Sequence, residues 1–367
     1  MKERSTKTYL LLIGIFALSL LIGCSSDDSK PDETDDGYVA TPKPLTVPPI
    51  FAQLLPPPSV PADNPQTVEG IALGRKLFFD PILSGDGTQA CASCHKPSNS
   101  FTDDARLSIG IDGFEGTRNS MPIYNMAWNT DSKFFWDGRA NSIEQQALEP
   151  VTNPIEMHNT WENAVGSLQN HSQYPELFNK AFGTTTITKE LTAKAIAQFE
   201  RTLISANSPF DRYLLGENSL TPQEINGFQI FMDEARGDCF HCHGNEFNPL
   251  WTDNIFHNNG LDAIITDKGL GEVTGDPNQD GLFKSPSLRN LAYTAPYMHD
   301  GRFETLDEVI NHYSEGLVYS PTIDPLMKAI SQGGVHLTES DKADLKAFLL
   351  SLSDPSFINN PNFQDPN

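Results

Sequence analysis

Positive charge is scarce in this sequence. It holds 25 Lys and Arg residues against 48 Asp and Glu residues, so its formal net charge is -23. A surface of this sign repels phosphate groups, which excludes a general affinity for nucleic acid and disfavours docking on anionic lipid. We therefore expect a soluble, acidic surface whose natural partner is basic.

Cysteine is rare, and four of the five cysteines lie in two Cys-x-x-Cys-His motifs at residues 91–95 and 239–243. This motif is typical of c-type haem attachment, in which the thiols bond the vinyl groups and the histidine becomes the proximal iron ligand. A zinc site or two redox dithiols are the alternatives, since Cys-x-x-Cys alone fits either. The wide separation of the pairs and the histidine at both haem positions favour two covalent haem c groups. The cysteines that attach these haems would be Cys91, Cys94, Cys239 and Cys242, and the histidines that ligate their iron would be His95 and His243.

A membrane-spanning segment is not indicated at the N-terminus, because the apolar run over residues 9–22 is too short. Basic residues precede this run, and it closes on Leu-Ile-Gly-Cys, so residues 1–23 are predicted to be an export signal. The ending resembles a bacterial lipobox, which would make Cys24 a lipid-bearing N-terminus on the periplasmic side of a membrane. The outer membrane is favoured, because Ser25 does not indicate inner-membrane retention. An uncleaved anchor helix is the alternative, and it leaves the protein on the same side.

Persistent alternation of apolar and polar residues is missing, which argues against a large sheet. Capping boxes predict helices that begin after Thr221 and Thr305, another helix follows Thr338, and an amphipathic helix lies between residues 187 and 204. No internal repeat is evident beyond the two motifs. We predict an all-α fold with long loops and two cytochrome c-like domains.

The domain plan follows from composition. Residues 24–64 are rich in Ser, Asp and Pro and are predicted to form a disordered, extended tether. An N-terminal haem domain over 65–205 and a C-terminal haem domain over 206–355 would follow, with a tail over 356–367. The polar segment 205–209 marks the boundary between the two domains.

Several further segments resemble the bacterial di-haem cytochrome c peroxidase/MauG family over roughly residues 68–352. They are Leu-Phe-Phe-Asp at 77–80, Phe-Thr-Asp at 101–103, Arg-Asn at 118–119, Phe-Trp-Asp-Gly-Arg at 135–139, Asn-Pro-Ile-Glu-Met at 153–157, Pro-Ser-Leu-Arg-Asn at 286–290 and Thr-Ala-Pro-Tyr-Met-His-Asp-Gly-Arg at 294–302. The resemblance implies that the N-terminal haem reacts with hydrogen peroxide. The C-terminal haem would store electrons from a small, basic cytochrome or cupredoxin and deliver them.

Peroxide cleavage needs a group that takes a proton from one oxygen and returns it to the other. By resemblance, Glu156 is this catalytic acid/base and Gln146 is its companion in the distal pocket. Pro150 matches a pocket-lining proline of MauG. The alternative for Glu156 is a solvated carboxylate in a loop.

A histidine is missing where ordinary peroxidases of this family carry one that blocks the peroxidatic iron. The Ser-Ile-Gly segment at 108–110 is followed by Ile111, and no histidine lies between His95 and His158. Isoleucine cannot coordinate iron. The resemblance then implies a haem that reacts without prior reduction, as in MauG.

The sixth ligand of the C-terminal haem has three candidates. Met298 offers a thioether, but it sits where related peroxidases carry phenylalanine. Tyr313 stands nineteen residues after Thr294, where the peroxidases place their ligating methionine and MauG its ligating tyrosine. His312 competes with it. We expect Tyr313 to be the ligand.

Two further roles come from the resemblance alone. Trp136 matches the tryptophan that carries electrons between the haems, although a tryptophan in an apolar segment is more often simple core. Calcium is expected near the haems, held by oxygen atoms of Asn119, Thr294 and Pro296.

These patterns predict a di-haem enzyme that reduces hydrogen peroxide to water at the N-terminal haem with electrons delivered through the C-terminal haem. The alternatives are a MauG-like oxidase that uses peroxide to modify a protein partner, and a non-catalytic electron-transfer cytochrome.

Overall fold

Helices of this chain begin where a side chain can accept a hydrogen bond from the free backbone N–H groups of the first turn. In the computed structural model, which describes residues 38–366, Thr221, Thr305 and Thr338 each accept a bond from the backbone N–H three residues on. The acidic residue at that position returns a bond in all three cases. The three predicted helices are confirmed as α9 (Pro222–Met232), α12 (Leu306–Glu315) and α13 (Glu339–Ser351).

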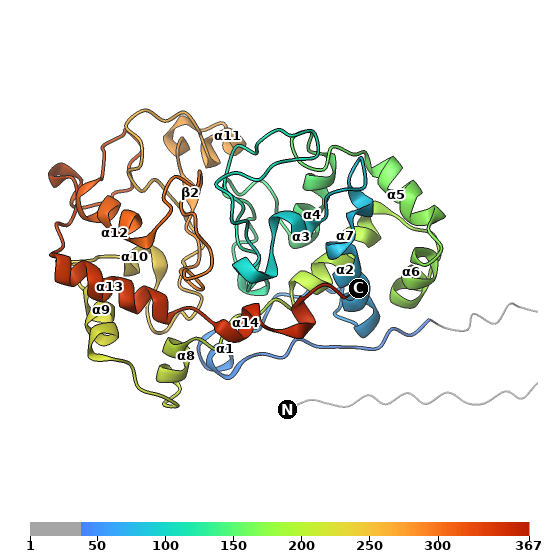
Figure 1. Ribbon diagram of the computed structural model, residues 1–367, viewed down its shortest axis with the longest axis horizontal. Helices are drawn as coiled ribbons and strands as arrows, with labels where there is room; N and C mark the ends of the chain where they lie inside the picture. Colours follow the sequence, from blue (N-terminus) through green and yellow to red (C-terminus); the bar gives the residue numbers. More distant parts are fainter. Residues whose placement is uncertain (1–37, 367) are drawn as a thin grey trace, which may run out of the picture. The chain divides into compact units, whose positions relative to one another are not determined.

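Helices make up most of the regular structure (Figure 1). The other α-helices are α1 (Pro49–Leu54), α2 (Val68–Phe79), α3 (Cys91–Cys94), α4 (Ile143–Thr152), α5 (Trp161–Asn170), α6 (Tyr174–Phe182), α7 (Lys189–Glu200), α8 (Pro209–Leu214), α10 (Phe240–His243), α11 (Leu270–Thr274) and α14 (Pro355–Ile358). Short 3-10 helices are η1 (Pro81–Leu83), η2 (Pro97–Asn99), η3 (Met126–Trp128), η4 (Pro277–Gln279), η5 (Ile330–Gln332) and η6 (Pro361–Phe363). The helix expected between residues 187 and 204 is α7, and it ends earlier, at Glu200.

A small sheet departs from the all-α prediction. Within the described residues, β1 (Phe256–His257) and β2 (Phe283–Lys284) form one antiparallel pair, with Phe256 opposite Lys284. The fold is therefore helix-rich with a minor strand pairing.

Two helix crossings support the two Cys-x-x-Cys-His motifs. The helix before the first motif, α2, packs on α7, and the helix before the second motif, α9, packs on α13 (Figure 1). Gly74 and Gly227 stand at these crossings, where an added Cβ would lie 1.9 Å from the carbonyl oxygen of Ala195 or Asp344. Because glycine has no Cβ, the paired backbones can approach this closely.

Each crossing lies within its own apolar core. Leu77, Phe178 and Ile196 are buried around α2 and α7, while Phe231 and Phe348 are buried around α9 and α13. Burying one such side chain contributes about 1.5–3 kcal/mol to stability. Each motif therefore rests on its own helical frame.

The two halves share a hairpin as well as a motif. Residues 134–140 and 297–303 each close through an isolated antiparallel bridge between their end residues, and each contains Asp-Gly-Arg. Phe135 and Met298 occupy the same place in the two hairpins, both with positive φ, 66° and 75°. The structure therefore shows a short repeat in addition to the motifs, of which the sequence retains only the shared Asp-Gly-Arg. Sequence reasoning missed this repeat because most equivalent residues differ in type.

Each hairpin accepts a backbone hydrogen bond from the other half. The N–H of Lys284 donates to the carbonyl of Trp136 at 2.9 Å, and the N–H of Asn119 donates to the carbonyl of His299 at 2.7 Å. Trp136 and His299 are equivalent positions in the hairpins. This reciprocal pairing joins the two motif-bearing halves directly.

The predicted tether differs from the structure over residues 38–64. Ile50 and Phe51 of α1 are buried with Trp128 and Leu250, and Asn64 is buried too. The apolar side chains of this Pro-rich segment pack against residues of other segments. Composition alone therefore wrongly predicted disorder for residues 38–64. The predicted export signal, Cys24 and the start of the tether lie outside the described residues.

Residues from Tyr38 onward form one compact unit. The boundary predicted at 205–209 therefore stays a prediction, although Ser205 itself is buried.

The tail is packed, because Phe357 and Phe363 join a cluster with Phe78 and Phe101. No helix in the described part of the chain is long and apolar enough to cross a membrane.

Candidate active site

The first motif ends on a histidine that is oriented from one side. His95 follows α3, and its Nδ1 lies 2.9 Å from the carbonyl oxygen of Phe101, which requires Nδ1–H to donate. This bond leaves Nε2 with its lone pair free to bind iron. Burial lowers the pKa of His95, so the ring is held neutral, as a metal ligand must be.

A serine lies beside the histidine of each motif. The hydroxyl of Ser285 donates to the carbonyl of Cys242 at 3.0 Å and lies 3.4 Å from Nδ1 of His243. Ser120 makes the same pair of contacts with Cys94 and His95, at 3.1 and 3.4 Å. Burial lowers the pKa of His243 to about 4, which again gives a neutral ring.

A cavity opens over each motif. The first has a volume of about 730 Å³ and is lined by Cys91, Cys94 and His95. The second, of about 240 Å³, is lined by Cys239, Cys242 and His243, with mostly apolar neighbours. Two thiols and a neutral imidazole on the wall of a large, mainly apolar cavity are the donor set that a c-type haem needs.

The cysteines do not suit the alternatives. Burial raises the pKa of the Cys91 thiol and of the Cys239 thiol to about 12, which disfavours a reactive dithiol. Among residues 38–366, no group of three or more His, Cys, Asp or Glu side chains is placed to hold a metal ion. The two pairs therefore serve two separate sites.

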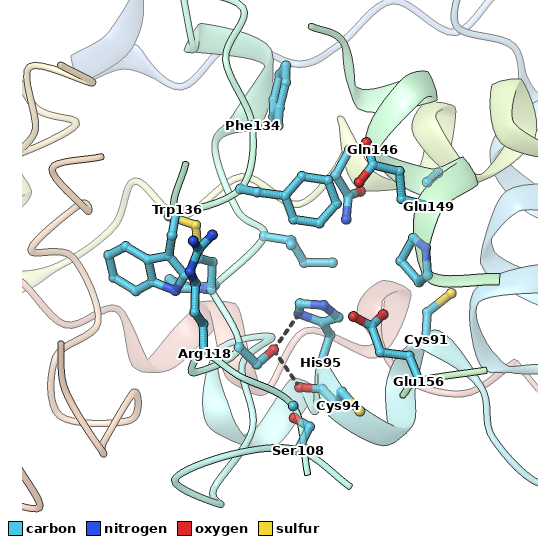
Figure 2. Close-up of a pocket in the computed structure, with 18 of the residues that line it drawn as sticks. Cys91, Cys94, His95, Ser108, Arg118, Phe134, Trp136, Gln146, Glu149 and Glu156 are labelled. Carbon is cyan, nitrogen blue, oxygen red and sulfur yellow. Dashed lines mark hydrogen bonds between the residues drawn. The ribbon is translucent and has the colours of Figure 1, made fainter. Parts of the chain in front are cut away.

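Glu156 and Gln146 both line the first cavity with His95 (Figure 2). The carboxylate of Glu156 accepts a hydrogen bond from Nδ2 of Asn153 at 2.6 Å, and burial raises its pKa. Gln146 and Pro150 come from α4, whose Ser142 cap fixes the start of the helix. The expected distal residues thus line one cavity, where Glu156 is half-buried in the turn after α4. Its role as the acid/base stays a prediction.

The loop that carries Ile111 docks on the Glu156 segment. The N–H of Ile111 donates to the carbonyl of Glu156 at 3.0 Å, and the nearby Ser108 lines the cavity. His158 points elsewhere, because its Nδ1 pairs with Asp112 and its side chain is about half exposed. Of the histidines in the described part of the chain, His95 alone lines this cavity.

In the second cavity, Tyr313 and Met298 lie close together. Nδ2 of Asn259 donates to the hydroxyl of Tyr313 at 3.1 Å and lies 3.6 Å from Sδ of Met298. Burial raises the pKa of Tyr313 to about 12. His312 does not line this cavity, and its Nε2 is bonded to the carbonyl of Asn259 at 3.1 Å. The histidine alternative is therefore disfavoured, and two candidates for the ligand stay open.

Trp136 lines both cavities. It is buried, and its indole N–H donates to the carbonyl of Asn119 at 2.8 Å. Asn119, Thr294 and Pro296 all line the second cavity, and the side chain of Asn119 donates to the carbonyl of Arg106 at 3.1 Å. The structure brings the expected calcium ligands to one cavity wall, and the ion itself stays a prediction.

Sequence reasoning missed two buried charged residues of these walls. Glu200, at the end of α7, lines the first cavity with one carboxylate oxygen unpaired, and burial raises its pKa to about 8. Lys284 lines both cavities. No motif marks either residue, because each is brought to its cavity by helix and strand packing alone.

Known proteins share this architecture. A family model for di-haem cytochrome c peroxidase matches residues 68–219. The methylamine utilization protein MauG of Methylophilus methylotrophus is 36% identical over 303 residues, which cover 81% of this chain and 86% of that protein. Cytochrome c peroxidase Ccp of Escherichia coli (strain K12) is 35% identical over 306 residues, which cover 80% of this chain and 60% of that protein.

Solved structures agree with the sequence matches. A MauG-like protein associated with microbial copper homeostasis superimposes with a TM-score of 0.77 at 36% identity, covering 86% of this chain and 97% of that chain. The diheme peroxidase BthA from Burkholderia thailandensis, at 21% identity and a TM-score of 0.69, covers 89% of this chain and 98% of its own, and supports the fold alone. The chain therefore belongs to the di-haem cytochrome c peroxidase/MauG family, whose members are haem-containing oxidoreductases that use peroxide.

Proposed function

We propose that this protein reduces hydrogen peroxide to water in the His95 cavity with electrons that arrive through the His243 cavity. The supporting observation is that Glu156, Gln146 and His95 line one cavity. A bound haem would supply the iron that binds peroxide and passes it electrons. Glu156 takes a proton from one peroxide oxygen and returns it to the other, while two further protons and two electrons complete the conversion to two waters.

Electrons would reach this cavity past Trp136. Its ring lines both cavities and its N–H is anchored on the backbone of Asn119, so the indole is held in one orientation between the two sites. An oxidisable aromatic group in this place shortens the transfer distance. The donor we propose is a small, basic cytochrome or cupredoxin, because the chain carries a net charge of -23.

The first site is proposed to react without prior reduction. Ile111, which follows Gly110, has no ligating atom, and His158 is engaged with Asp112 and does not line the cavity. For the second site we propose Tyr313 as the sixth ligand. Met298 occupies the hairpin position that Phe135 has in the other half, which favours a packing role for its side chain.

Electron paramagnetic resonance of the ferric protein as isolated tests both sites together. We expect one high-spin haem at the first site, which reacts with peroxide without a reductive pre-treatment, and one low-spin haem at the second. Tyr313→Phe should change the spin state of the second haem or open it to added ligands, whereas the matched Met298→Leu should leave it low-spin.

Two low-spin haems at rest, with reactivity only after half-reduction, would contradict the first assignment. If Tyr313→Phe kept its spectrum and Met298→Leu lost it, methionine would be the ligand and the second assignment would be wrong.

Two other functions share these features. A MauG-like oxidase that modifies a protein partner is favoured by the cavity with His95 as its sole histidine among the described residues. A non-catalytic electron-transfer cytochrome is the other. Stopped-flow mixing of peroxide with this protein and a reduced small cytochrome separates them: a peroxidase oxidises the cytochrome as peroxide disappears, and a pure carrier consumes no peroxide. An oxidase would transfer the oxidation to a protein side chain instead, detected by mass spectrometry.

We place the haems in two predominantly helical domains, over 65–205 and 206–355, and a calcium ion at Asn119, Thr294 and Pro296. A lipid on Cys24 would hold the protein on the periplasmic side of a membrane, the outer one by preference. Metal analysis of the purified protein tests the ion, and mass spectrometry of detergent-extracted protein tests the lipid.

A further inference from the structure

Lys284 occupies an unusual place for a lysine. It lies in β2, only 7% of its surface is exposed, and it lines both haem cavities. Its backbone N–H donates to the carbonyl of Trp136, so the wall that carries it is the wall shared by the two sites.

The groups that the ammonium contacts directly are neutral. It donates a hydrogen bond to the backbone carbonyl of Lys133 at 2.6 Å and stands 5.6 Å from the ring centroid of Phe134. Asp131 and Asp253 influence it through space, but no carboxylate of the described residues lies within ion-pair distance.

The other cations of the cavity walls differ. The lysines and arginines that line either cavity, within the described residues, are Arg118, Arg139, Lys284 and Lys328. Arg118 pairs with Asp137 and Asp267, Arg139 with Glu149, and Lys328 with Asp238 at 3.3 Å. Lys284 is thus the wall cation left without an acidic partner.

A buried ammonium without an anion is costly, because the desolvation of the charge is not offset by a partner. Burial accordingly lowers the pKa of Lys284 to about 8. A group that brings its own carboxylates into the cavity would remove this cost.

We propose that the ammonium of Lys284 is the ionic partner of a haem propionate at the wall shared by the two cavities. Haem is the group that the Cys-x-x-Cys-His motifs bind, and its propionates are the carboxylates it carries. A fixed positive charge on that edge favours the ferrous state, in which the haem has one more negative charge. Lys284 is therefore a positioning residue that also sets the haem potential.

The test compares Lys284→Gln, Lys284→Arg and, as a matched control, Lys133→Gln. The ammonium of Lys133 bonds to Asn141 in an exposed hydrogen bond, so its loss removes the same charge nearby without touching the cavity wall. Covalent haem is counted first, since this inference rests on the proposed haem loading. Midpoint potentials of both haems are then measured by spectroelectrochemical titration.

For Lys284→Gln we expect at least one haem with a lower potential, so that its ferrous-to-ferric ratio at a fixed applied potential falls about tenfold, equivalent to about 59 mV for one electron. Lys284→Arg and Lys133→Gln should keep potentials close to those of the unaltered protein. Two haems with unchanged potentials in Lys284→Gln would overturn the inference, whereas absence of covalent haem from the unaltered protein would instead overturn the proposed function.

A second measurement covers the case in which Lys284→Gln does not retain both haems. Lys284→Arg keeps the charge but changes the donor geometry, so the propionate bending band in its resonance Raman spectrum should shift from that of the unaltered protein. An unchanged band would show that Lys284 does not contact a propionate.

Discussion

Replacing Glu156 with glutamine should slow peroxide cleavage about a hundredfold or more, the usual scale for a lost proton-transfer group. Glutamine keeps the size of the side chain and its place beside Asn153, but an amide does not take a proton from peroxide. Both haem spectra should therefore stay nearly unchanged. Single-turnover mixing with peroxide in a stopped-flow instrument measures the rate directly.

The pH dependence of the rate of peroxide cleavage tests the role of Glu156 independently. Burial raises the pKa of Glu156, and the proton-accepting form exists above that pKa. The rate should therefore fall as the pH is lowered through a value above the ordinary range of a glutamate, and this acid limb should vanish in Glu156→Gln. Glu162→Gln on the exposed side of α5 is the matched control and should retain both rate and profile. An unchanged rate in Glu156→Gln would make Glu156 a bystander.

Replacing Cys91 and Cys94 together with alanine should remove one of two covalent haems and abolish peroxide turnover. His95 would lose the group whose iron it ligates, and Glu156 and its companion Gln146 would line a cavity without iron to bind peroxide. Haem staining of the denatured protein and its mass count the remaining haem.

The matched variant removes Cys239 and Cys242 instead. It should also lose one haem, but its first site should still react with peroxide in a single turnover and then lack electrons for the next. Recovery of zinc in place of haem, with no haem absorbance in the unaltered protein, would overturn the whole assignment.

Local signals in the sequence predicted local structure well. Thr221, Thr305 and Thr338 cap the helices they were expected to cap, because a cap depends on residues within one turn. The prediction of a disordered tether was wrong for residues 38–64, because their order depends on residues far away in the chain. Ile50 and Phe51 pack on Trp128 and Leu250. The composition of a segment does not indicate which distant residues it will pack against.

The candidate site divides in the same way. Residues tied to a motif or family segment, such as His95, Glu156 and Tyr313, were named from the chain alone, and they line the expected cavities. Their surroundings were not predictable. The contact of Ser285 with His243 joins residues forty-two positions apart and has no local pattern.

By itself the sequence determined the two Cys-x-x-Cys-His motifs and the lack of a histidine directly after Gly110, and its resemblance to the family indicated Glu156 as the distal carboxyl group. These depend on residue type and spacing, which the chain states directly. Tertiary structure alone decided which groups face the same space. The reciprocal bonds of Asn119 and Lys284 place Trp136 between two cavities, and they leave a buried ammonium beside both. Burial and partnership arise only when distant segments pack, and they set the pKa of Glu156 and the electrostatic role of Lys284.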